Sequence, residues 1–465
     1  MTMKKRIFFF VAMFVYSAFG YGQTDVSGSW KGVLKVGGLP LRLVLNIEGV
    51  PGNYTATLDS PDQGAMGMPV TWVTFEKDTL RFAATQLGAS YEGVLAEGEV
   101  KGTFKQRGMT FPLDITRKNG EDDIKFSRPQ EPKEPFPYKT EQVTFENKKA
   151  GIRLAGTLSL PAGKGPFPAV VLVSGSGPQD RDSNLFGHKP FLVLSDYLTR
   201  NGVAVLRYDD RGTAESEGDF SAATTVDFSE DAEAAFDYLK ARKETIDDRT
   251  GIVGHSEGGI IAPMVASRRA DVGFIVMLAG VGIKGSELLL QQQEEIAWAS
   301  GVSPVNVKIA KTINRGIFEV AEKAEGKTEL RKGLLDYAKK NPLAIPQGGT
   351  AETFASQHTK TLGSPWMMGF LRHEPSVYLK KVNCPVLAVF GGKDLQVPAK
   401  KNLEAMKAAL KEAGNTKVGF KVLPGLNHLF QECEKGLPAE YPTIKQTISP
   451  ALMMGLANWI LKRAQ

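Results

Sequence analysis

The segment IVGHSEGG, residues 252–259, joins a short apolar run to the start of a helix-like stretch. Its serine, Ser256, has one glycine two positions before it and another two positions after it. A serine on a sharp turn between a strand and a helix needs small residues there, because larger side chains would collide with both elements. No other G-x-S-x-G occurs in the chain. The segment therefore predicts a strand–turn–helix unit that presents Ser256 as a nucleophile.

The sequence around this segment alternates between strand-like and helix-like stretches. Continuous apolar runs, typical of parallel strands covered on both faces, occur at residues 168–173, 202–206, 251–253, 274–278 and 385–390. Helix-like stretches occur at residues 228–243, 258–268, 401–413 and 447–463. This alternation predicts a doubly wound, mostly parallel α/β sheet over residues 140–465. Residues 283–375 are amphipathic and contain no strand-like run, which predicts a helical cap inserted between two strands.

The N-terminal part of the chain has a different pattern. Between residues 23 and 120, short runs alternate polar and apolar residues between glycines, as at 41–47 and 54–58. This pattern predicts a small antiparallel β-barrel or β-sandwich without catalytic residues. A structural or docking role and a ligand-binding role are both open for it. Residues 121–139 carry four prolines among charged residues and are predicted to form a stiff linker.

Residues 1–22 have the layout of a secretory signal peptide. Three basic residues at 4–6 precede an apolar run at 7–16, and small residues follow at positions 18, 20 and 22. The apolar run is shorter than the roughly 20 residues that a membrane-spanning helix needs. We therefore expect a cleaved leader and a periplasmic or secreted protein without a stable membrane span. An uncleaved anchor is the alternative.

Composition and charge exclude several classes of protein. The chain has 465 residues, 42% of them apolar, which is enough for about two to three domains with proper cores. Its net charge of +6 falls to +3 once Lys4, Lys5 and Arg6 leave with the leader, which is too small to indicate a nucleic-acid partner. Cys384 and Cys433 form no metal-binding motif with histidines, so no metal site is expected. Whether these two thiols pair is open.

The predicted nucleophile requires a base and an acid elsewhere in the chain. A serine hydroxyl is a poor nucleophile at neutral pH, so a base must accept its proton and an acid must orient that base. In an α/β sheet of this kind the order along the chain is serine, then an acid after a later strand, then histidine. Asp394 follows the apolar run at 385–390, and His428 follows a strand-like run at 418–423. Ser256, Asp394 and His428 are therefore the predicted catalytic residues.

Backbone N–H groups have to stabilise the negative oxygen of the tetrahedral intermediate. One predicted donor is the N–H of Glu257, which follows the nucleophile at the dipole-positive start of a helix. The second donor is expected in the glycine-rich loop after the strand that ends at residue 173. Ser176 is favoured there, with Gly175 and Gly177 as alternatives.

Other polar residues are expected to have structural roles. The charged clusters at 180–182 and 207–212 are predicted to be ion pairs that brace loops rather than catalysts. His358 and His373 lie inside the helical insertion, and the side chains of His255 and Glu257 are expected to pack within the turn beside the serine.

The cap insertion bears on the substrate. Its return segment, residues 365–371, runs back towards the strand that leads to Asp394. Trp366, Met367 and Phe370 in this segment are candidates to line an acyl pocket, and the alternative is that they form the core of the cap. The insertion has no excess of acidic residues that would bind the amino terminus of a peptide. This favours an ester with a small or medium apolar acyl group.

These landmarks resemble those of the alpha/beta-hydrolase superfamily, specifically its carboxylesterase and serine-aminopeptidase-like branch. The resemblance covers residues from about 140 to 465 and rests on SGSGPQDRD at 174–182, YDDRG at 208–212, GHSEGG at 254–259, GGKD at 391–394 and NH at 427–428. It implies a cofactor-free hydrolase whose insertion covers the pocket. Ser174 departs from the histidine that many members have before the oxyanion loop. The β-domain resembles N-terminal domains of some secreted bacterial hydrolases, which assigns it no role.

The sequence thus predicts an extracytoplasmic serine hydrolase that acts on a small-molecule ester. A peptidase with the same mechanism is the nearest alternative, and a non-catalytic protein that binds a glycan or a lipid is the alternative from another class. Because His428 has to be neutral to accept a proton, activity is expected to rise with pH through the region of about 6 to 7. The oligomeric state is open.

Overall fold

The computed structural model describes residues 25–36, 39–60, 62, 65–106, 108–117, 127–346 and 348–463. It separates into two compact units, an N-terminal β-domain and a C-terminal α/β unit that includes the described residues from 127 onwards. The predicted leader, residues 1–22, and residues 121–126 of the predicted linker lie outside the described residues.

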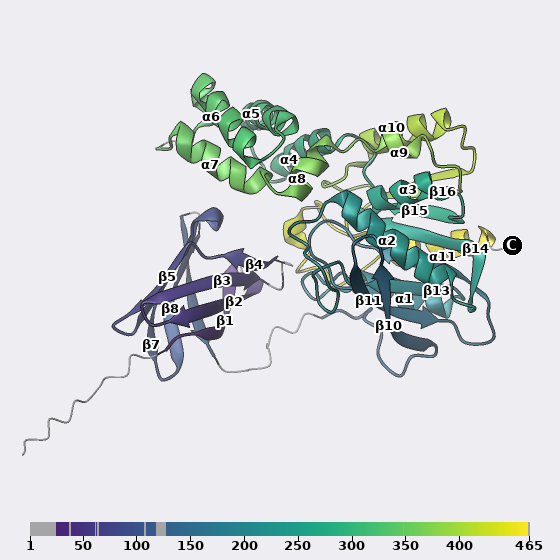
Figure 1. The fold of residues 1–465 in the computed structure, drawn as a ribbon, viewed down its shortest axis with the longest axis horizontal. Coiled ribbons are helices and arrows are strands. Elements are labelled where there is room, and N and C mark those ends of the chain that lie inside the picture. Colours follow the sequence, from purple (N-terminus) through teal and green to yellow (C-terminus); the bar gives the residue numbers. More distant parts are fainter. Residues whose placement is uncertain are drawn as a thin grey trace, which may run out of the picture. The chain divides into compact units, whose positions relative to one another are not determined.

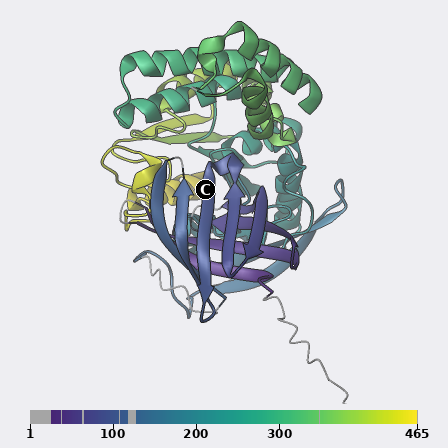
Figure 2. The same ribbon diagram turned by 90° about the vertical axis from the view of Figure 1, so that its left-hand side faces the viewer.

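The β-domain consists of antiparallel strands in the order β4-β3-β2-β1-β9-β8-β7-β6-β5. Figure 2 shows these strands side by side in a curved sheet. Within the described ranges they form one sheet with β4 and β5 at its edges, so an open barrel describes the domain better than a two-sheet sandwich. The strands are β1 (Gly28–Val36), β2 (Leu39–Val50), β3 (Asn53–Ser60), β4 (Ala65–Pro69), β5 (Trp72–Glu76), β6 (Thr79–Ala84), β7 (Ala89–Ala96), β8 (Glu99–Gln106) and β9 (Met109–Thr116).

The α/β unit is built on an eight-stranded sheet in the order β10-β11-β13-β12-β14-β15-β16-β17. The first two strands pair antiparallel and the remaining strands pair parallel, which confirms the predicted doubly wound, mostly parallel sheet. The strands are β10 (Lys139–Asn147), β11 (Ile152–Leu160), β12 (Phe167–Val173), β13 (Ala204–Tyr208), β14 (Thr245–His255), β15 (Phe274–Leu278), β16 (Val386–Gly391) and β17 (Val418–Leu423).

Helices cover both faces of this sheet. Because successive side chains of a strand point to opposite faces, Val171 and Val173 of β12 pack in one core while Val170 and Leu172 pack in the other. Helices on the first face are α2 (Thr225–Lys240), α3 (Gly258–Arg268), α9 (Ser376–Leu379) and α10 (Ala399–Glu412). Those on the second face are α1 (Pro190–Arg200) and α11 (Pro450–Arg463).

A helical cap lies between β15 and β16 in the chain. It contains α4 (Gly285–Ala299), α5 (Pro304–Lys323), α6 (Lys327–Lys340), α7 (Ala351–Leu362) and α8 (Pro365–Arg372), with a short 3-10 turn at Pro342–Ala344. The cap has its own apolar core, which includes Ile317, Leu330, Leu334 and Leu371. Figure 1 shows these five helices as a separate green group beside the layers of the sheet. The cap is therefore a small subdomain with its own packed core.

Residues 127–138 are bound to the α/β unit instead of forming a free spacer. The Arg128 guanidinium donates to the carbonyl oxygens of Phe186, Pro442 and Ile444 at 2.7, 3.0 and 2.8 Å. The Gln130 side-chain oxygen accepts from the N–H of Thr447 at 2.6 Å. The described part of the predicted linker is thus fixed by the side chains of Arg128 and Gln130. The pattern of prolines did not indicate these two residues.

Replacing Arg128 with alanine is expected to lower the free energy of unfolding by about 3 kcal/mol, because three backbone carbonyls lose a charged donor. Chemical denaturation of the intact protein measures this change. Arg331→Ala on the exposed side of α6 is the matched control. An equal, small effect of both substitutions would contradict the importance of the Arg128 contacts.

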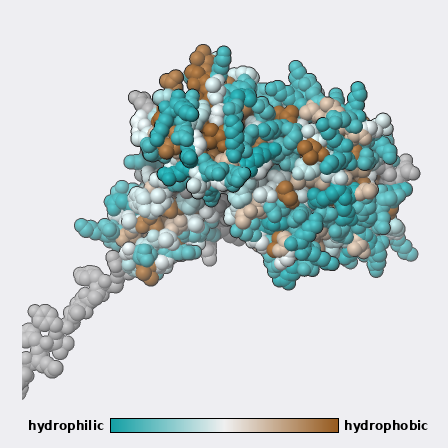
Figure 3. All heavy atoms as spheres, turned by 45° about the horizontal axis from the view of Figure 1, so that its top comes forward, coloured by the Kyte–Doolittle hydropathy of each residue, from teal (hydrophilic) through white to brown (hydrophobic). Residues whose placement is uncertain are grey.

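The molecular surface is mainly hydrophilic on the face that Figure 3 shows, with small apolar areas separated from one another. Among the side chains that the structure describes, Leu343 in the cap is the most exposed large apolar one, at 94%. Isolated apolar side chains of this kind are common on protein surfaces and indicate no partner. Across the parts of the chain that the structure describes, no helix is both long and apolar enough to cross a bilayer.

Candidate active site

Ser256 lies on the sharp turn between β14 and α3. Its φ of +55° is in the left-handed region, and its N–H donates to the carbonyl oxygen of Leu278 at 2.8 Å. A Cβ atom on Gly254 would lie 1.9 Å from the carbonyl oxygen of Gly258. A Cβ atom on Gly258 would lie 2.2 Å from the carbonyl oxygen of Val173. Both glycines are therefore required by close backbone contacts, as the G-x-S-x-G spacing predicts.

Asp394 and His428 meet beyond the carboxyl ends of β16 and β17. Asp394 Oδ2 lies 2.8 Å from His428 Nδ1, and both side chains are buried. Asp394 Oδ1 accepts the backbone N–H groups of Gln396 and Val397 at 2.8 and 2.9 Å. Because a carboxylate with these partners accepts at Oδ2, the His428 proton lies on Nδ1 and leaves Nε2 as a free base.

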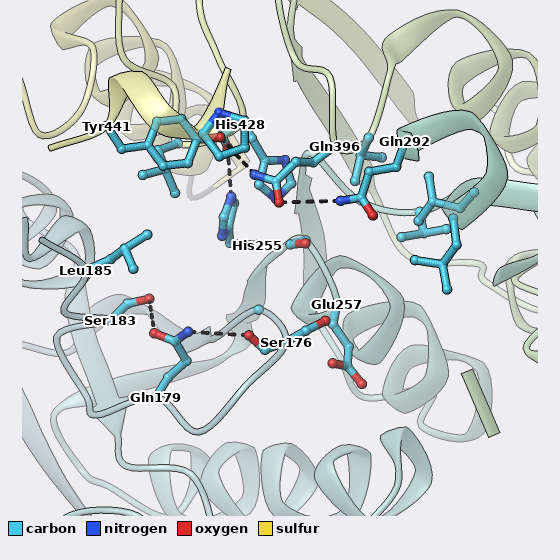
Figure 4. A pocket seen from close by; sticks show the side chains of 18 of the residues that line it. Ser176, Gln179, Ser183, Leu185, His255, Glu257, Gln292, Gln396, His428 and Tyr441 are labelled. Atoms are coloured by element: carbon cyan, nitrogen blue, oxygen red, sulfur yellow. Dashed lines mark hydrogen bonds between the residues drawn. The ribbon is translucent and has the colours of Figure 1, made fainter. Parts of the chain in front are cut away.

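Ser256 and His428 line the same cavity, which has a volume of about 450 Å³. Figure 4 shows His428 on the wall of this cavity, above His255. In the described part of the chain no hydrogen bond joins the Ser256 hydroxyl to the imidazole. Catalytic hydrogen bonds are often long in structures without substrate and shorten when substrate binds. The fold thus brings Ser256 and His428 to one cavity and pairs His428 with Asp394 behind its wall.

His255 forms a hydrogen bond with the backbone of His428. Its Nε2 lies 2.9 Å from the backbone oxygen of His428, and the two ring centroids are 4.8 Å apart. Since a carbonyl oxygen only accepts, the proton of His255 lies on Nε2. Burial, followed by the nearby His428, lowers the pKa of His255 to about 4, so the ring stays neutral and keeps this donor. His255 is therefore more than packing beside the serine, as it orients the loop that carries the base.

His255→Phe is expected to lower kcat about tenfold with little change in KM, because the ring stays but the hydrogen bond that positions His428 is lost. Steady-state kinetics on an ester measures both constants. His358→Phe is the matched control, because that histidine packs on Phe354 within the cap. Equal kinetics of the two variants would contradict the positioning role.

The loop after β12 passes directly over Ser256. A Cβ atom on Gly175 would lie 3.1 Å from Ser256 Cβ, so a larger residue would crowd the serine. Asp210 fixes this loop, because its two oxygens accept the Ser174 hydroxyl at 2.7 Å and the Gln179 N–H at 3.0 Å. Burial raises the pKa of Asp210 to about 8.

The two predicted oxyanion donors are backbone N–H groups of residues that line the cavity. Ser176 and Glu257 belong to its lining, and within the described residues neither backbone N–H has a protein acceptor. Unpaired donors of this kind at a helix start can bind a developing negative oxygen. The geometry is therefore compatible with the predicted pair of donors.

Comparisons with known proteins bear on this arrangement. Residues 189–434 match the family model described as serine aminopeptidase, S33. The chain is also 30% identical to esterase EstD of Thermotoga maritima over 324 residues, which are 69% of this chain and 68% of that protein. The chain therefore belongs to the serine aminopeptidase, S33, family of hydrolases. The match confirms the predicted superfamily and branch, and it identifies the protein as a hydrolase with an esterase relative.

Two solved structures also have similar chains. Est1E from Butyrivibrio proteoclasticus, solved with bound ferulic acid, is 18% identical, with a TM-score of 0.40 over 69% of this chain and 99% of that chain. An esterase of Pyrococcus furiosus is 15% identical, with a TM-score of 0.41 over 70% of this chain and 91% of that chain.

The charged clusters of this hydrolase form ion pairs, as predicted. Arg181 Nε donates to Asp209 Oδ1 at 3.0 Å, and Arg211 Nε donates to Asp231 Oδ2 at 2.6 Å. Arg207 pairs with Asp182. The Arg181 and Arg207 pairs connect the loop after β12 to β13 and its following loop, whereas the Arg211 pair connects the loop after β13 to α2. Asp210 is the exception in the second cluster, because it supports the loop above Ser256.

The cap supplies much of the apolar wall of the cavity. Trp366 and Phe370 of α8 line it, and their rings stack at 5.2 Å. Met367 does not line the cavity and packs against the core of the cap, which corrects its assignment as a pocket residue. Positions four apart on a helix share a face, whereas a neighbouring position points about 100° away. Leu288 and Leu289 of α4 complete this wall.

Further polar side chains line the cavity without having been expected, and three of them form a row. Gln396 Nε2 donates to the Tyr441 hydroxyl at 2.8 Å, and Gln292 Nε2 lies 3.5 Å from Gln396 Oε1. Figure 4 shows this row beside His428. Gln396 lies two residues after Asp394, which is a usable sequence signal. Tyr441 comes from an irregular loop, and nothing in its local sequence indicates a pocket.

The remaining candidates lie away from the cavity. His358 packs on Phe354 with ring centroids 4.3 Å apart, and His373 stacks on Tyr378 at 5.4 Å. The two thiols, at Cys384 and Cys433, are free in the structure. Among the residues with described positions, no group of three His, Cys, Asp or Glu side chains is arranged to hold a metal ion.

Proposed function

We propose that this hydrolase is an extracytoplasmic serine esterase that cleaves carboxylic esters with small to medium acyl groups. The observation that carries the proposal is the Asp394–His428 hydrogen bond in the cavity that Ser256 also lines. The esterase relative supports the same reaction class.

The proposed reaction has two halves. Ser256 Oγ attacks the carbonyl carbon of the ester while His428 Nε2 accepts the hydroxyl proton, and the carbonyl oxygen becomes negative. The N–H groups of Glu257 and Ser176 stabilise that oxygen. The carbon–oxygen bond to the alcohol then breaks, and His428 returns the proton to the leaving alcohol. Water, deprotonated by His428, repeats the sequence on the acyl-enzyme and releases the acid.

The acyl group is proposed to lie against the apolar wall formed by Leu288, Trp366 and Phe370. A cavity of about 450 Å³ is in the range of small-molecule sites, which supports a small or medium substrate. The polar side chains of Gln179, Gln292 and Gln396 line the same cavity and are suited to a polar alcohol part.

Export and the role of the β-domain belong to the same proposal. The basic–apolar–small order of residues 1–22 supports a cleaved leader and a periplasmic or secreted protein. Sequencing the N-terminus of the mature protein and fractionating cells tests this. A mature protein that starts at Met1 in the cytoplasm would contradict it. For the β-domain a structural or docking role is proposed.

A serine aminopeptidase is the second candidate, because the family description names this activity and because the cavity contains one carboxyl group. The cap has no excess of acidic residues, but Glu257 provides one carboxyl group in the cavity. In this second function the Glu257 carboxyl group would be the amine anchor, outside the cap. Comparing kcat/KM on p-nitrophenyl acetate and butyrate with kcat/KM on aminoacyl anilides separates the two functions.

The proposal is tested on the intact protein with a fluorophosphonate probe. We expect covalent labelling of the native chain and none of Ser256→Ala, together with a preference for the simple esters. Labelling that persists in the variant would refute Ser256 as the nucleophile. No labelling and no turnover of either chain would favour the non-catalytic alternative, a glycan- or lipid-binding protein.

A further inference from the structure

Glu257 is the acidic side chain among the residues that line the cavity, and it follows the proposed nucleophile directly in the chain. It is 2% exposed. Its backbone N–H is a proposed donor to the oxyanion, whereas its side-chain carboxyl group is hydrogen-bonded to other residues. The length of a glutamate side chain keeps the carboxyl group within roughly 6 Å of that N–H. The charge of the carboxyl group therefore acts directly on the reaction.

Several elements pack against this carboxyl group. Oε1 accepts the Thr225 hydroxyl of α2 at 2.7 Å and the Trp366 indole N–H of cap helix α8 at 2.8 Å. The Ser176 hydroxyl from the loop after β12 is a further hydrogen-bond partner. Asp210, after β13, is the other buried acid that interacts with Glu257 electrostatically.

No cation balances Glu257. In the described portion of the chain its carboxyl group makes no ion pair, and the two imidazoles of the cavity have other partners: His255 donates to a backbone oxygen and His428 donates to Asp394. A buried carboxylate without a cation is unfavourable, and the usual outcome is the neutral acid. Since Oε1 already accepts two hydrogen bonds, the proton of a neutral Glu257 belongs on Oε2.

A negative Glu257 would also oppose catalysis. The tetrahedral intermediate places a negative charge beside the backbone N–H of this same residue, and like charges a few ångströms apart in a water-poor cavity repel strongly. The neutral acid has no such effect and still accepts the hydrogen bonds from Thr225 and Trp366. The Trp366 bond connects the cap to the turn that carries Ser256, and the Thr225 bond connects α2 to the same turn.

We propose that Glu257 works in its neutral form, as the link between the cap and the oxyanion site, and that its ionisation sets an alkaline limit to the activity. This inference rests on the proposed function. It assigns Glu257 as a positioning residue whose protonation state governs the rate. Burial raises the pKa of Glu257, against the opposing effect of its hydrogen bonds from Thr225, Trp366 and Ser176, which agrees with this assignment.

The test compares the pH profiles of wild type, Glu257→Gln and the exposed control Glu404→Gln, using ethyl butyrate and measuring released butyrate from about pH 5.5 to about pH 9. Glutamine keeps an oxygen acceptor but cannot ionise. We expect wild type and the control to lose activity on the alkaline side, and the ratio of kcat in Glu257→Gln to kcat in wild type to rise about tenfold over this range. The readout is the shape of the profile and not its height.

Trp366→Phe gives a second, independent readout. It keeps the ring stack with Phe370 and removes one donor to the carboxyl group. Because a hydrogen bond to the ionised form lowers a carboxyl pKa, its loss raises the pKa of Glu257, and the alkaline limit should move to higher pH. A purely structural contact would change kcat or KM without moving this limit.

A spectroscopic measurement does not depend on turnover. The infrared carbonyl band of a protonated carboxyl group should be present in resting wild type at neutral pH and reduced in Glu257→Gln. Two results would overturn the inference: parallel alkaline limbs in wild type and Glu257→Gln, or a wild-type spectrum without the Glu257 band. Failure of the proposed function is distinguishable, because ester turnover would then be equal in wild type and Ser256→Ala.

Discussion

Replacing Ser256 with alanine is expected to lower kcat for p-nitrophenyl butyrate by roughly 10⁴-fold or more. The substitution removes the proposed nucleophile, which forms the acyl-enzyme in the proposed mechanism, while the proposed donors at residues 176 and 257 remain to polarise the substrate. Steady-state turnover, corrected for spontaneous hydrolysis, measures the loss. KM is expected to change little, since the lining of the cavity is otherwise intact.

The folded state should tolerate this change. The Ser256 hydroxyl has no hydrogen-bond partner in the described portion of the chain, so its removal leaves no buried group unpaired. Thermal unfolding of the variant is the control and should match wild type closely. A folded Ser256→Ala variant with more than about a hundredth of wild-type kcat would be incompatible with the proposed mechanism.

Asp394→Asn is expected to lower kcat by about 10⁴-fold through a change of tautomer. The asparagine oxygen can still accept the N–H groups of Gln396 and Val397, so the loop keeps its shape. Its NH₂ group then faces His428 Nδ1 and requires an acceptor there. The imidazole proton moves to Nε2, where the proposed base needs a lone pair.

Kinetics on the same ester measures the loss, and the ring nitrogen signals in an NMR spectrum report the tautomer. Asp219→Asn is a matched control, because Asp219 pairs only locally with Ser221 in an exposed loop. An Asp394→Asn variant with near-normal kcat, or with the proton still on Nδ1, would show that the acid does not orient the base.

Much of the fold could be predicted because local physical requirements are visible in the sequence. The strand–turn–helix unit around Ser256 depends on glycines whose Cβ atoms would collide with nearby backbone. The parallel strands appear as continuous apolar runs because both of their faces are buried. Asp394 and His428 could be chosen because parallel strands bring their following loops to one edge of the sheet. The hydrogen bond between them agrees with that choice.

Other parts of the site could not be predicted, because they depend on contacts between distant segments. Met367 and Phe370 are both apolar residues of one short helix, and only the packing of α8 decides that the first faces the cap core and the second the cavity. The role of His255 depends on a backbone oxygen 173 positions later. Tyr441 reaches the cavity from a loop without a recognisable pattern.

Alone, the amino-acid order determined the sheet, the turn at Ser256 and the choice of the proposed nucleophile, acid and base, since strand burial, turn sterics and topological order are local or one-dimensional properties. Tertiary structure decided which atoms surround each of those groups. It placed Arg128 on three carbonyl groups, His255 beneath His428, and the Glu257 carboxyl between a core threonine and a cap tryptophan. Burial and hydrogen-bond partners set the charge of such groups, and both arise only when segments far apart in the chain pack together.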